Sequence, residues 1–456
     1  MHPLLLRVFE RLEQANICYC LLRGYEELET ALDGGDVDML VQGSDVERMH
    51  ALLSQIGFAY LPSWGRGPHQ FFVAYDEQTD RWLKLDVVTS VTYGKPIPSI
   101  ETDLAIGCLA RRQRRGPTFV PAPEDELVAL LLHCMLDKGD FPANRSRRLT
   151  ELRHEVNDSR YLTEQLHKYW SPAMTWPRMD DVFAREAWRE LLADRPAVVR
   201  HLTRGQSLRV AARSIGGRVL RKLDRVAGMV QPRALTVALL ALDGGGKTTL
   251  ANQLTKTFYL PSRYIYMGTN IEASTVGLPT TRWIQAHSRR PSGAARMPAW
   301  VAARSLRFVN NMVEQWYRYA TSYYHMIRGR LVLFDRYVYD SPGSTSGRRS
   351  LKSRARHWLL SAAAPKPSLV VCLDAPGEVL FARKGEHSPA ILEQQRQHYL
   401  GLQKYLPQMV VVDATREADQ VRRSVTSLIW RGYADLLSQD RANGGRYAYP
   451  MERAND

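Results

Sequence analysis

A short glycine run between an apolar strand and a helix constrains this chain more than any other feature. The segment Leu235–Leu242 is apolar apart from one threonine, which is typical of a strand buried on both faces of a parallel sheet. A helical pattern of apolar residues follows after Thr249. The loop between them reads Asp243-Gly244-Gly245-Gly246-Lys247-Thr248-Thr249. This order predicts a cradle of backbone N–H groups at a helix N-terminus, which suits phosphate.

The loop matches the second half of the Walker pattern G-x-x-x-x-G-K-[ST], although Ala241 stands where the first glycine belongs. The pattern predicts that Lys247 reaches the β- and γ-phosphates and that the Thr248 hydroxyl ligates Mg²⁺. A glycine turn without a ligand is the alternative, and the flanking strand and helix argue against it. ATP and Mg²⁺ are the predicted cofactors, with the loop from Asp243 to Thr249 as the ATP-binding segment.

Further apolar strands alternate with helical stretches after this loop, which predicts an α/β unit with a parallel sheet and flanking helices. The expected strands are Tyr264–Met267, Leu331–Phe334, Leu369–Leu373 and Met409–Val412. The second of these runs directly into Asp335-Arg336-Tyr337. Ligands of such sheets bind at the carboxyl edge of the strands, so a carboxylate and a guanidinium are expected there.

These pieces, in this order, resemble the thymidylate kinase-like family of P-loop kinases from Ala234 to about Ala434. The resemblance implies ATP-dependent phosphoryl transfer. It implies that Asp335 organises Mg²⁺ and the acceptor, that Arg336 binds phosphate oxygens, and that Arg383 and Lys384 close over ATP as a lid. It also implies a homodimer. The matching segments besides the glycine loop are Asp335–Tyr337, Val371–Asp374 with Pro376–Val379, Arg383–Glu386 and Val411–Ala414.

The acceptor half departs from the family pattern. Gly268-Thr269-Asn270 follows the second strand where the family has Arg-Glu-Pro. Glu314 stands where the family has an arginine for the monophosphate, with Arg318 one turn later. The segment from Asn270 to Asn310 is long and basic. The expected acceptor is therefore something other than dTMP.

Asp340 and Glu386 complete two further patterns, Asp-Arg-Tyr-x-x-Asp and Arg-Lys-x-Glu. Both are similar to kinase-like sequences of bacterial surface-polysaccharide loci. This resemblance implies a sugar or glycan hydroxyl as the acceptor, with Asp335 or Asp340 as general base. Phosphorylation of dTMP or another nucleoside monophosphate is the alternative. A nucleotide-binding scaffold that has lost its chemistry is the third.

Acidic residues on two expected strands mark the N-terminal part, an α+β region over residues 1–145. Asp36 and Asp38 alternate at the start of the strand expected at Val37–Val41, so they lie on one face. Asp86 on the strand Trp82–Val88 completes three carboxylates, a set that can hold two Mg²⁺ ions. The order resembles the nucleotidyltransferase superfamily over about residues 15–140. Gly24-Tyr25 differs from the family's Gly-Ser or Gly-Gly, so an active enzyme and a ligand-binding scaffold both remain open.

Residues 146–233 are expected to form a helical basic connector, followed by the kinase-like domain over 234–440 and a tail over 441–456. The chain carries a net charge of +15, which favours anionic partners. Within residues 206–230, arginines and Lys222 are interspersed with Leu, Val and Ile, and Gly216-Gly217 weakens the helix pattern. A linker helix with a solvated basic face and a contact with an anionic membrane surface or polyanion both fit this pattern.

Cysteines and hydropathy favour a cytoplasmic protein without a membrane span. The five cysteines show no CxxC pair, which predicts buried free thiols in a reducing compartment. No apolar run approaches the roughly 18–20 residues of a transmembrane helix. His133 on an apolar helix reads as a core histidine rather than a ligand. The aromatic run from Trp316 to Tyr324 has helical spacing, so core packing and an acceptor-stacking surface both remain open.

Overall fold

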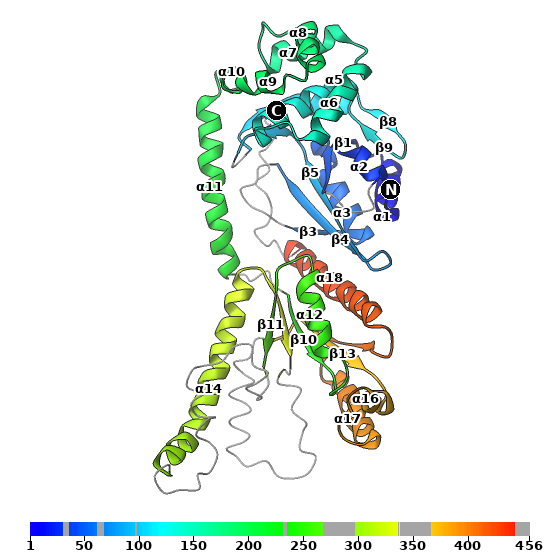
Figure 1. The fold of residues 1–456 in the computed structure, drawn as a ribbon, viewed down its shortest axis with the longest axis vertical. Helices are drawn as coiled ribbons and strands as arrows, with labels where there is room; N and C mark the ends of the chain where they lie inside the picture. The colour runs from blue at the N-terminus through cyan, green and yellow to red at the C-terminus, as the bar shows by residue number, and fades with distance from the viewer. Residues whose placement is uncertain are drawn as a thin grey trace. The chain divides into compact units, whose positions relative to one another are not determined.

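The computed structural model describes residues 1–30, 36–61, 68–95, 98–230, 235–267, 297–335, 337 and 366–442 (Figure 1). The chain divides into two compact units. Among the described residues, the first unit comprises those up to 226 together with 434–442, and the second comprises those from 227 to 433. No helix in these described ranges has the length and apolar character needed to cross a membrane.

A five-stranded mixed sheet forms the centre of the first unit, with the order β1-β2-β5-β4-β3. β2 and β5 run parallel, and the other neighbours are antiparallel. Side-chain alternation divides the apolar residues between two faces, because Leu21 and Met39 join one core while Cys20 and Leu40 join the other. The strands are β1 (Tyr19–Arg23), β2 (Asp36–Val41), β3 (Ala59–Leu61), β4 (Gln70–Asp76) and β5 (Arg81–Val88).

Helices cover both faces of this sheet. The helices α1 (Pro3–Gln14) and α3 (Val46–Ile56) contribute Phe9 and Met49 to one core. The helices α4 (Leu104–Ala110) and α5 (Pro123–Leu132) contribute Cys108 and Leu131 to the other. The remaining short elements are α2 (Tyr25–Thr30), η1 (Gly43–Asp45), the hairpin β6 (Val91–Tyr93) with β7 (Ile100–Thr102), and the hairpin β8 (Gln113–Arg115) with β9 (Thr118–Val120).

Five further helices complete the first unit rather than connecting two domains. Leu149, Leu166 and Phe183 from this segment pack in the same core as Leu131 of α5. The boundary expected after residue 145 therefore falls inside a helix whose apolar side is buried with the N-terminal part. The helices are α6 (Ala143–Glu155), α7 (Ser159–Tyr169), α8 (Trp176–Ala184), α9 (Trp188–Ala193) and α10 (Arg195–Leu202).

Three consecutive acids at the start of α5 anchor this packing. Glu124, Asp125 and Glu126 are all buried. Acidic residues that only stabilise the N-terminus of a helix could stay exposed, so these three have a further role. Arg148 of α6 donates two 2.8 Å hydrogen bonds to Glu126. Arg111, just after α4, contacts Glu124 at 2.6 Å. The acids thus tie α5 to its neighbours through buried ion pairs.

The second unit is built on a parallel sheet of five strands with the order β11-β12-β10-β13-β14. This confirms the expected α/β architecture of a parallel sheet with flanking helices. The strands are β10 (Thr236–Leu240), β11 (Ser262–Tyr266), β12 (Leu331–Asp335), β13 (Leu369–Asp374) and β14 (Met409–Asp413). The helices are α12 (Lys247–Thr257), α14 (Met297–Ile327), α16 (Gly377–Lys384) and α17 (Pro389–Gly401), with the short turn η5 (Leu402–Lys404). The part of α18 (Ala418–Ala442) up to Tyr433 also belongs to this unit.

Candidate functional site

The glycine loop joins the central strand β10 to α12, and its backbone requires glycine. Gly244 and Gly246 have φ values of 86° and 84°, a region that residues with a Cβ rarely adopt. A Cβ on Gly245 would lie 2.8 Å from the Cβ of Ala241. The absence of a side chain at residue 245 therefore accommodates the alanine that replaces the first Walker glycine.

Lys247 and the threonines after it form the first turn of α12. The Lys247 ammonium is buried and donates hydrogen bonds to the carbonyl oxygens of Ala241 and Leu242. Thr248 and Thr249 are exposed at the same helix end. The lysine thus folds over the loop, and the two threonines are exposed beside it.

Asp335 ends the neighbouring strand β12 at the same edge of the sheet. Its register partner in β10 is Leu239, two residues before Ala241. The Tyr264 hydroxyl on β11 donates a 2.5 Å hydrogen bond to Asp335 Oδ2. The other oxygen, Oδ1, is buried and accepts no hydrogen bond within the described part of the chain. A buried carboxylate oxygen without a donor is costly, and it fits a Mg²⁺ ion, which prefers oxygen ligands.

Replacing Tyr264 with phenylalanine should lower kcat about tenfold, because the hydroxyl holds Asp335 in place and a hydrogen bond to a charged group contributes about 1.5–3 kcal/mol. The apparent Mg²⁺ affinity in a steady-state titration should change with it, which a purely structural role would not cause. Tyr323→Phe, on an exposed position of α14, is the control. Unchanged kcat and Mg²⁺ dependence for Tyr264→Phe would show that Tyr264 does not position Asp335.

The expected lid residues lie at the end of α16. Lys384 Nζ lies 3.8 Å from Asp243 of the glycine loop and 3.1 Å from Glu386. Arg383 instead donates a 3.0 Å hydrogen bond to the carbonyl oxygen of Ala414. The structure therefore brings Lys384, and not the Arg383 guanidinium, to the loop.

The residue that replaces the family's acceptor arginine, Glu314, and the arginine one turn later both lie on α14. Arg318 and Glu314 form a buried ion pair with an N–O distance of 2.7 Å. The aromatic residues on the same helix fit each of the two interpretations, core packing and an acceptor-stacking surface, only in part. Tyr319 packs in the core, whereas Trp316 and Tyr317 are exposed. Outside the described residues lie the predicted site residues Arg336 and Asp340, most of the basic acceptor segment (residues 268–296) and the tail from residue 443.

Comparison with known proteins decides the family. A thymidylate kinase of Xanthomonas oryzae pv. oryzae strain PXO99A is 30% identical over 222 residues, which are 47% of this chain and 90% of the relative. The chain belongs to the thymidylate kinase family. The thymidylate kinase of Xanthomonas euvesicatoria pv. vesicatoria is 29% identical over 222 residues, 46% of this chain and 90% of the relative.

The other comparisons add no separate assignment. No model of a protein family matches the chain. The solved thymidylate kinase of Candida albicans aligns with 18% sequence identity and a TM-score of 0.28, over 47% of this chain and 93% of the other. Membership in the thymidylate kinase family, over about half of the chain, supports nucleotide kinase-type phosphoryl transfer. The second unit, which carries the family motifs, is called the kinase unit below.

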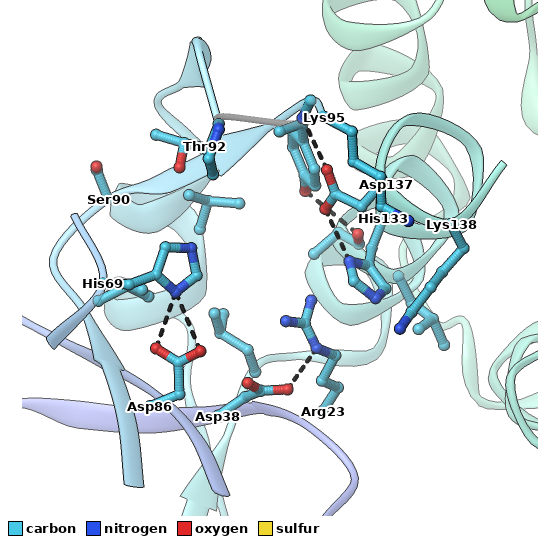
Figure 2. A pocket seen from close by; sticks show the side chains of 18 residues that line it. Arg23, Asp38, His69, Asp86, Ser90, Thr92, Lys95, His133, Asp137 and Lys138 are labelled. Carbon is cyan, nitrogen blue, oxygen red and sulfur yellow. Dashed lines mark hydrogen bonds and ion pairs between the residues drawn. The ribbon is translucent and has the colours of Figure 1, made fainter. Parts of the chain in front are cut away.

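A cavity of about 270 Å³ in the first unit gathers two of the three predicted N-terminal carboxylates (Figure 2). Asp38 and Asp86 are register partners on the parallel strands β2 and β5. Asp38 accepts a 2.5 Å hydrogen bond from Arg23, and Asp86 accepts bonds of 2.8 and 3.0 Å from His69. Asp36 lies on β2, and its side chain is outside the described part.

The two carboxylates that line this cavity are each paired with a basic side chain, Asp38 with Arg23 and Asp86 with His69. Two carboxylates in register can share one hard cation. Among the described residues, no three His, Cys, Asp or Glu side chains form a metal-binding group. A two-metal site would therefore depend on Asp36.

The cavity also contains His133, which the sequence predicts to be a core histidine, together with Asp137 (Figure 2). His133 and Asp137 lie on η2 (His133–Lys138), a π-helical turn that continues α5. Their side chains are 2.8 Å apart, and Asp137 also accepts a 2.7 Å hydrogen bond from the backbone N–H of Gly94. Burial lowers the pKa of His133. In the sequence, only the spacing of four residues between His133 and Asp137, directly after an apolar helix, pointed to this pair.

Proposed function

We propose that the kinase unit transfers the γ-phosphoryl group of ATP to an acceptor placed beside Asp335. The observation that carries this proposal is the buried, unpartnered Oδ1 of Asp335 at the sheet edge where the glycine loop begins. A carboxylate and a phosphate cradle at one edge are the parts that position Mg²⁺ and the β- and γ-phosphates in P-loop enzymes.

Each residue has a distinct task in this proposal. The backbone N–H groups of Gly244–Gly246 hold phosphate oxygens, and Lys247 leaves its contacts with the loop carbonyls to bind the β- and γ-phosphates. Thr248 and Asp335 would hold Mg²⁺, which neutralises charge that develops on the transferred group. Lys384 adds a cation beside the loop, and Arg336 and Arg383 remain candidate phosphate ligands.

A nucleoside monophosphate is the acceptor class that the relatives suggest, since the similar curated proteins are named thymidylate kinases. We therefore take dTMP as the first acceptor to test. Phosphate acceptors generally need an arginine or lysine whose charge is available to the phosphate oxygens.

A hydroxyl acceptor, such as a sugar or glycan, is the second candidate, and the ion pair on α14 favours it. Arg318 lies one turn after Glu314, the residue at the position where the family has its acceptor arginine, and Glu314 neutralises it at 2.7 Å within the core. An acceptor that carries no phosphate at this point would not require a compensating charge. Asp335, or Asp340 outside the described residues, would then act as the general base.

An ADP-release assay with matched acceptors separates these two candidates. The wild-type protein should be tested with dTMP, the other nucleoside monophosphates, thymidine, and neutral mono- and oligosaccharides. Turnover restricted to monophosphates would establish the nucleotide acceptor, and turnover only with sugars would establish the hydroxyl acceptor. Tight ATP binding with no ADP from any acceptor would instead favour the non-catalytic nucleotide-binding scaffold.

Nucleotidyl transfer in the first unit is the second candidate activity, favoured by the register of Asp38 with Asp86 inside one cavity. Asp36, Asp38 and Asp86 would hold Mg²⁺, which supplies charge stabilisation for displacement at a phosphorus centre. Binding of Mn²⁺ as a spectroscopic probe should weaken in Asp38→Asn/Asp86→Asn while ATP binding at the kinase unit stays intact. Equal Mn²⁺ binding in that variant would leave this cavity a ligand-binding or structural feature.

A further inference from the structure

The helix α11 (Ser207–Val230) exposes its apolar stripe instead of burying it. Leu208, Ile215, Val219, Leu223 and Val226 recur at spacings of seven, four, four and three, which places them on one side of a helix. Their exposed fractions are 86%, 59%, 49%, 48% and 54%. A surface helix usually turns such a stripe toward the core. The stripe defined by these five residues is therefore unusual.

The opposite side of α11 is the side that packs against the first unit. Val210 packs against the hydrophobic core, and Gly217 is buried. Arg213 pairs with Glu101 of β7 at 2.5 Å. At about 100° per residue, Val210 and Gly217 point roughly opposite to Leu208 and Val219. The orientation of the helix thus directs the stripe away from the body of the first unit.

Basic residues border the stripe on both sides. Arg209 lies along one border, Arg218 and Lys222 lie along the other, and all three are exposed. From Ser207 to Val230 the sequence contains a single acidic residue, Asp224. An apolar stripe between two basic borders matches a surface with negative groups above an apolar layer.

We propose that α11 lies flat on an anionic lipid surface, with the stripe in the acyl boundary and the basic borders among the head groups. Two other occupants agree less well with these residues. A polyanion such as nucleic acid would bind the cations but would leave the apolar stripe in water. A second copy of α11 would bring basic borders against basic borders, which is repulsive in helix pairs.

Co-sedimentation of the full chain with vesicles tests this proposal. Vesicles of phosphatidylcholine with about 30 mol% phosphatidylglycerol should bind the protein at about 0.1 M salt, and pure phosphatidylcholine vesicles should bind it far less. Ile215→Gln/Val219→Gln/Leu223→Gln keeps the net charge and should weaken binding at least about tenfold. Arg218→Gln/Lys222→Gln should remove most of the preference for the anionic vesicles.

The controls make each outcome decisive. Ile106→Gln changes an exposed apolar residue of α4, with an exposed fraction of 70%, and should bind as the wild type does. All variants should keep the wild-type unfolding midpoint, which excludes misfolding. Wild-type protein that does not bind the anionic vesicles would overturn the proposal. Equal binding by the triple glutamine variant would also overturn it, since charge alone would then account for the attraction. If the wild type does not bind vesicles and the triple glutamine variant sediments as a smaller species than the wild type, the stripe would be assigned to a contact with a second copy.

Discussion

Replacing Lys247 with alanine is expected to lower kcat of the kinase unit by about 10²–10⁴-fold. Lys247 is the residue of the loop that can place a positive charge against the β- and γ-phosphates, where charge develops during transfer. In the structure its ammonium already lies at the loop, on the carbonyl oxygens of Ala241 and Leu242. The measurement is initial-rate ADP formation at saturating ATP, with the acceptor that the wild type uses.

Lys256→Ala provides the matched control for this prediction, because Lys256 is an exposed lysine in the last turn of the same helix. Its rate should remain within a factor of two of the wild type. A normal rate for Lys247→Ala would refute the assignment of the loop as the ATP site. A loss in both variants would point to a nonspecific effect of helix charge.

Replacing Arg148 with methionine is expected to reduce the free energy of unfolding of the first unit by about 3–5 kcal/mol. The change leaves Glu126 buried without its cation, and breaking one partner of a buried ion pair is strongly destabilising. Glu26 and Glu155, which contact Arg148 at 2.9 Å, lose this contact as well. The measurement is the urea midpoint of the first transition.

The pH dependence of this loss has a definite sign. Burial already raises the pKa of Glu126 in the wild type, although Arg148 opposes this rise. Without Arg148 the pKa rises further, so protonation relieves the buried charge and the loss should be smaller at pH 5 than at pH 8. Arg147→Met, at an exposed position of the same helix, should be neutral, and Arg148→Met/Glu126→Gln should recover part of the stability. An Arg148→Met midpoint equal to the wild type would contradict the anchoring role.

The fold of the kinase unit could be predicted from the sequence because its strands and its glycine loop are short, continuous segments. Most of its strands are apolar runs, and a buried parallel strand needs little more than that. The structure gives β10, β12 and β13 close to the predicted bounds. The glycine loop could be read as well, because phosphate binding fixes the residue types in one short segment.

Some residues of the family motifs hold the fold together, and the sequence alone does not show this role. Asp374, at the end of β13, is held by two hydrogen bonds from Arg396 of 2.7 and 2.8 Å. A Cβ on Gly377 would lie 2.4 Å from the carbonyl oxygen of Pro389. Asp374 therefore joins β13 to α17, and Gly377 permits the close approach of α16 to α17. A motif alone does not distinguish such packing from catalysis.

The first unit was harder to read because its organisation depends on long-range contacts. In α6–α10 the apolar residues are sparse, so the segment appears as a polar connector until Leu149 and Phe183 are seen in the core. The pair His133–Asp137 acquires its cavity only when Gly94 and Arg23 are brought beside it. Neither contact leaves a short-range pattern in the sequence.

The basic helix illustrates how a local rule can be overridden. Gly216-Gly217 predicts a weak point, yet α11 continues from Ser207 to Val230. Gly217 is buried, whereas a Cβ on Gly216 would meet nothing within 4 Å. The helix therefore forms despite the roughly 1 kcal/mol that each glycine costs inside a helix.

Acceptor-dependent transfer of the labelled γ-phosphoryl group from ATP is the most direct test of the central claim. The account predicts that wild-type protein labels an acceptor in the presence of Mg²⁺. Labelling should stop with EDTA or in Lys247→Ala, and it should fall steeply in Asp335→Asn. Failure to label any nucleoside monophosphate or sugar, by a folded protein that binds ATP tightly, would contradict a phosphoryl-transfer function for this site.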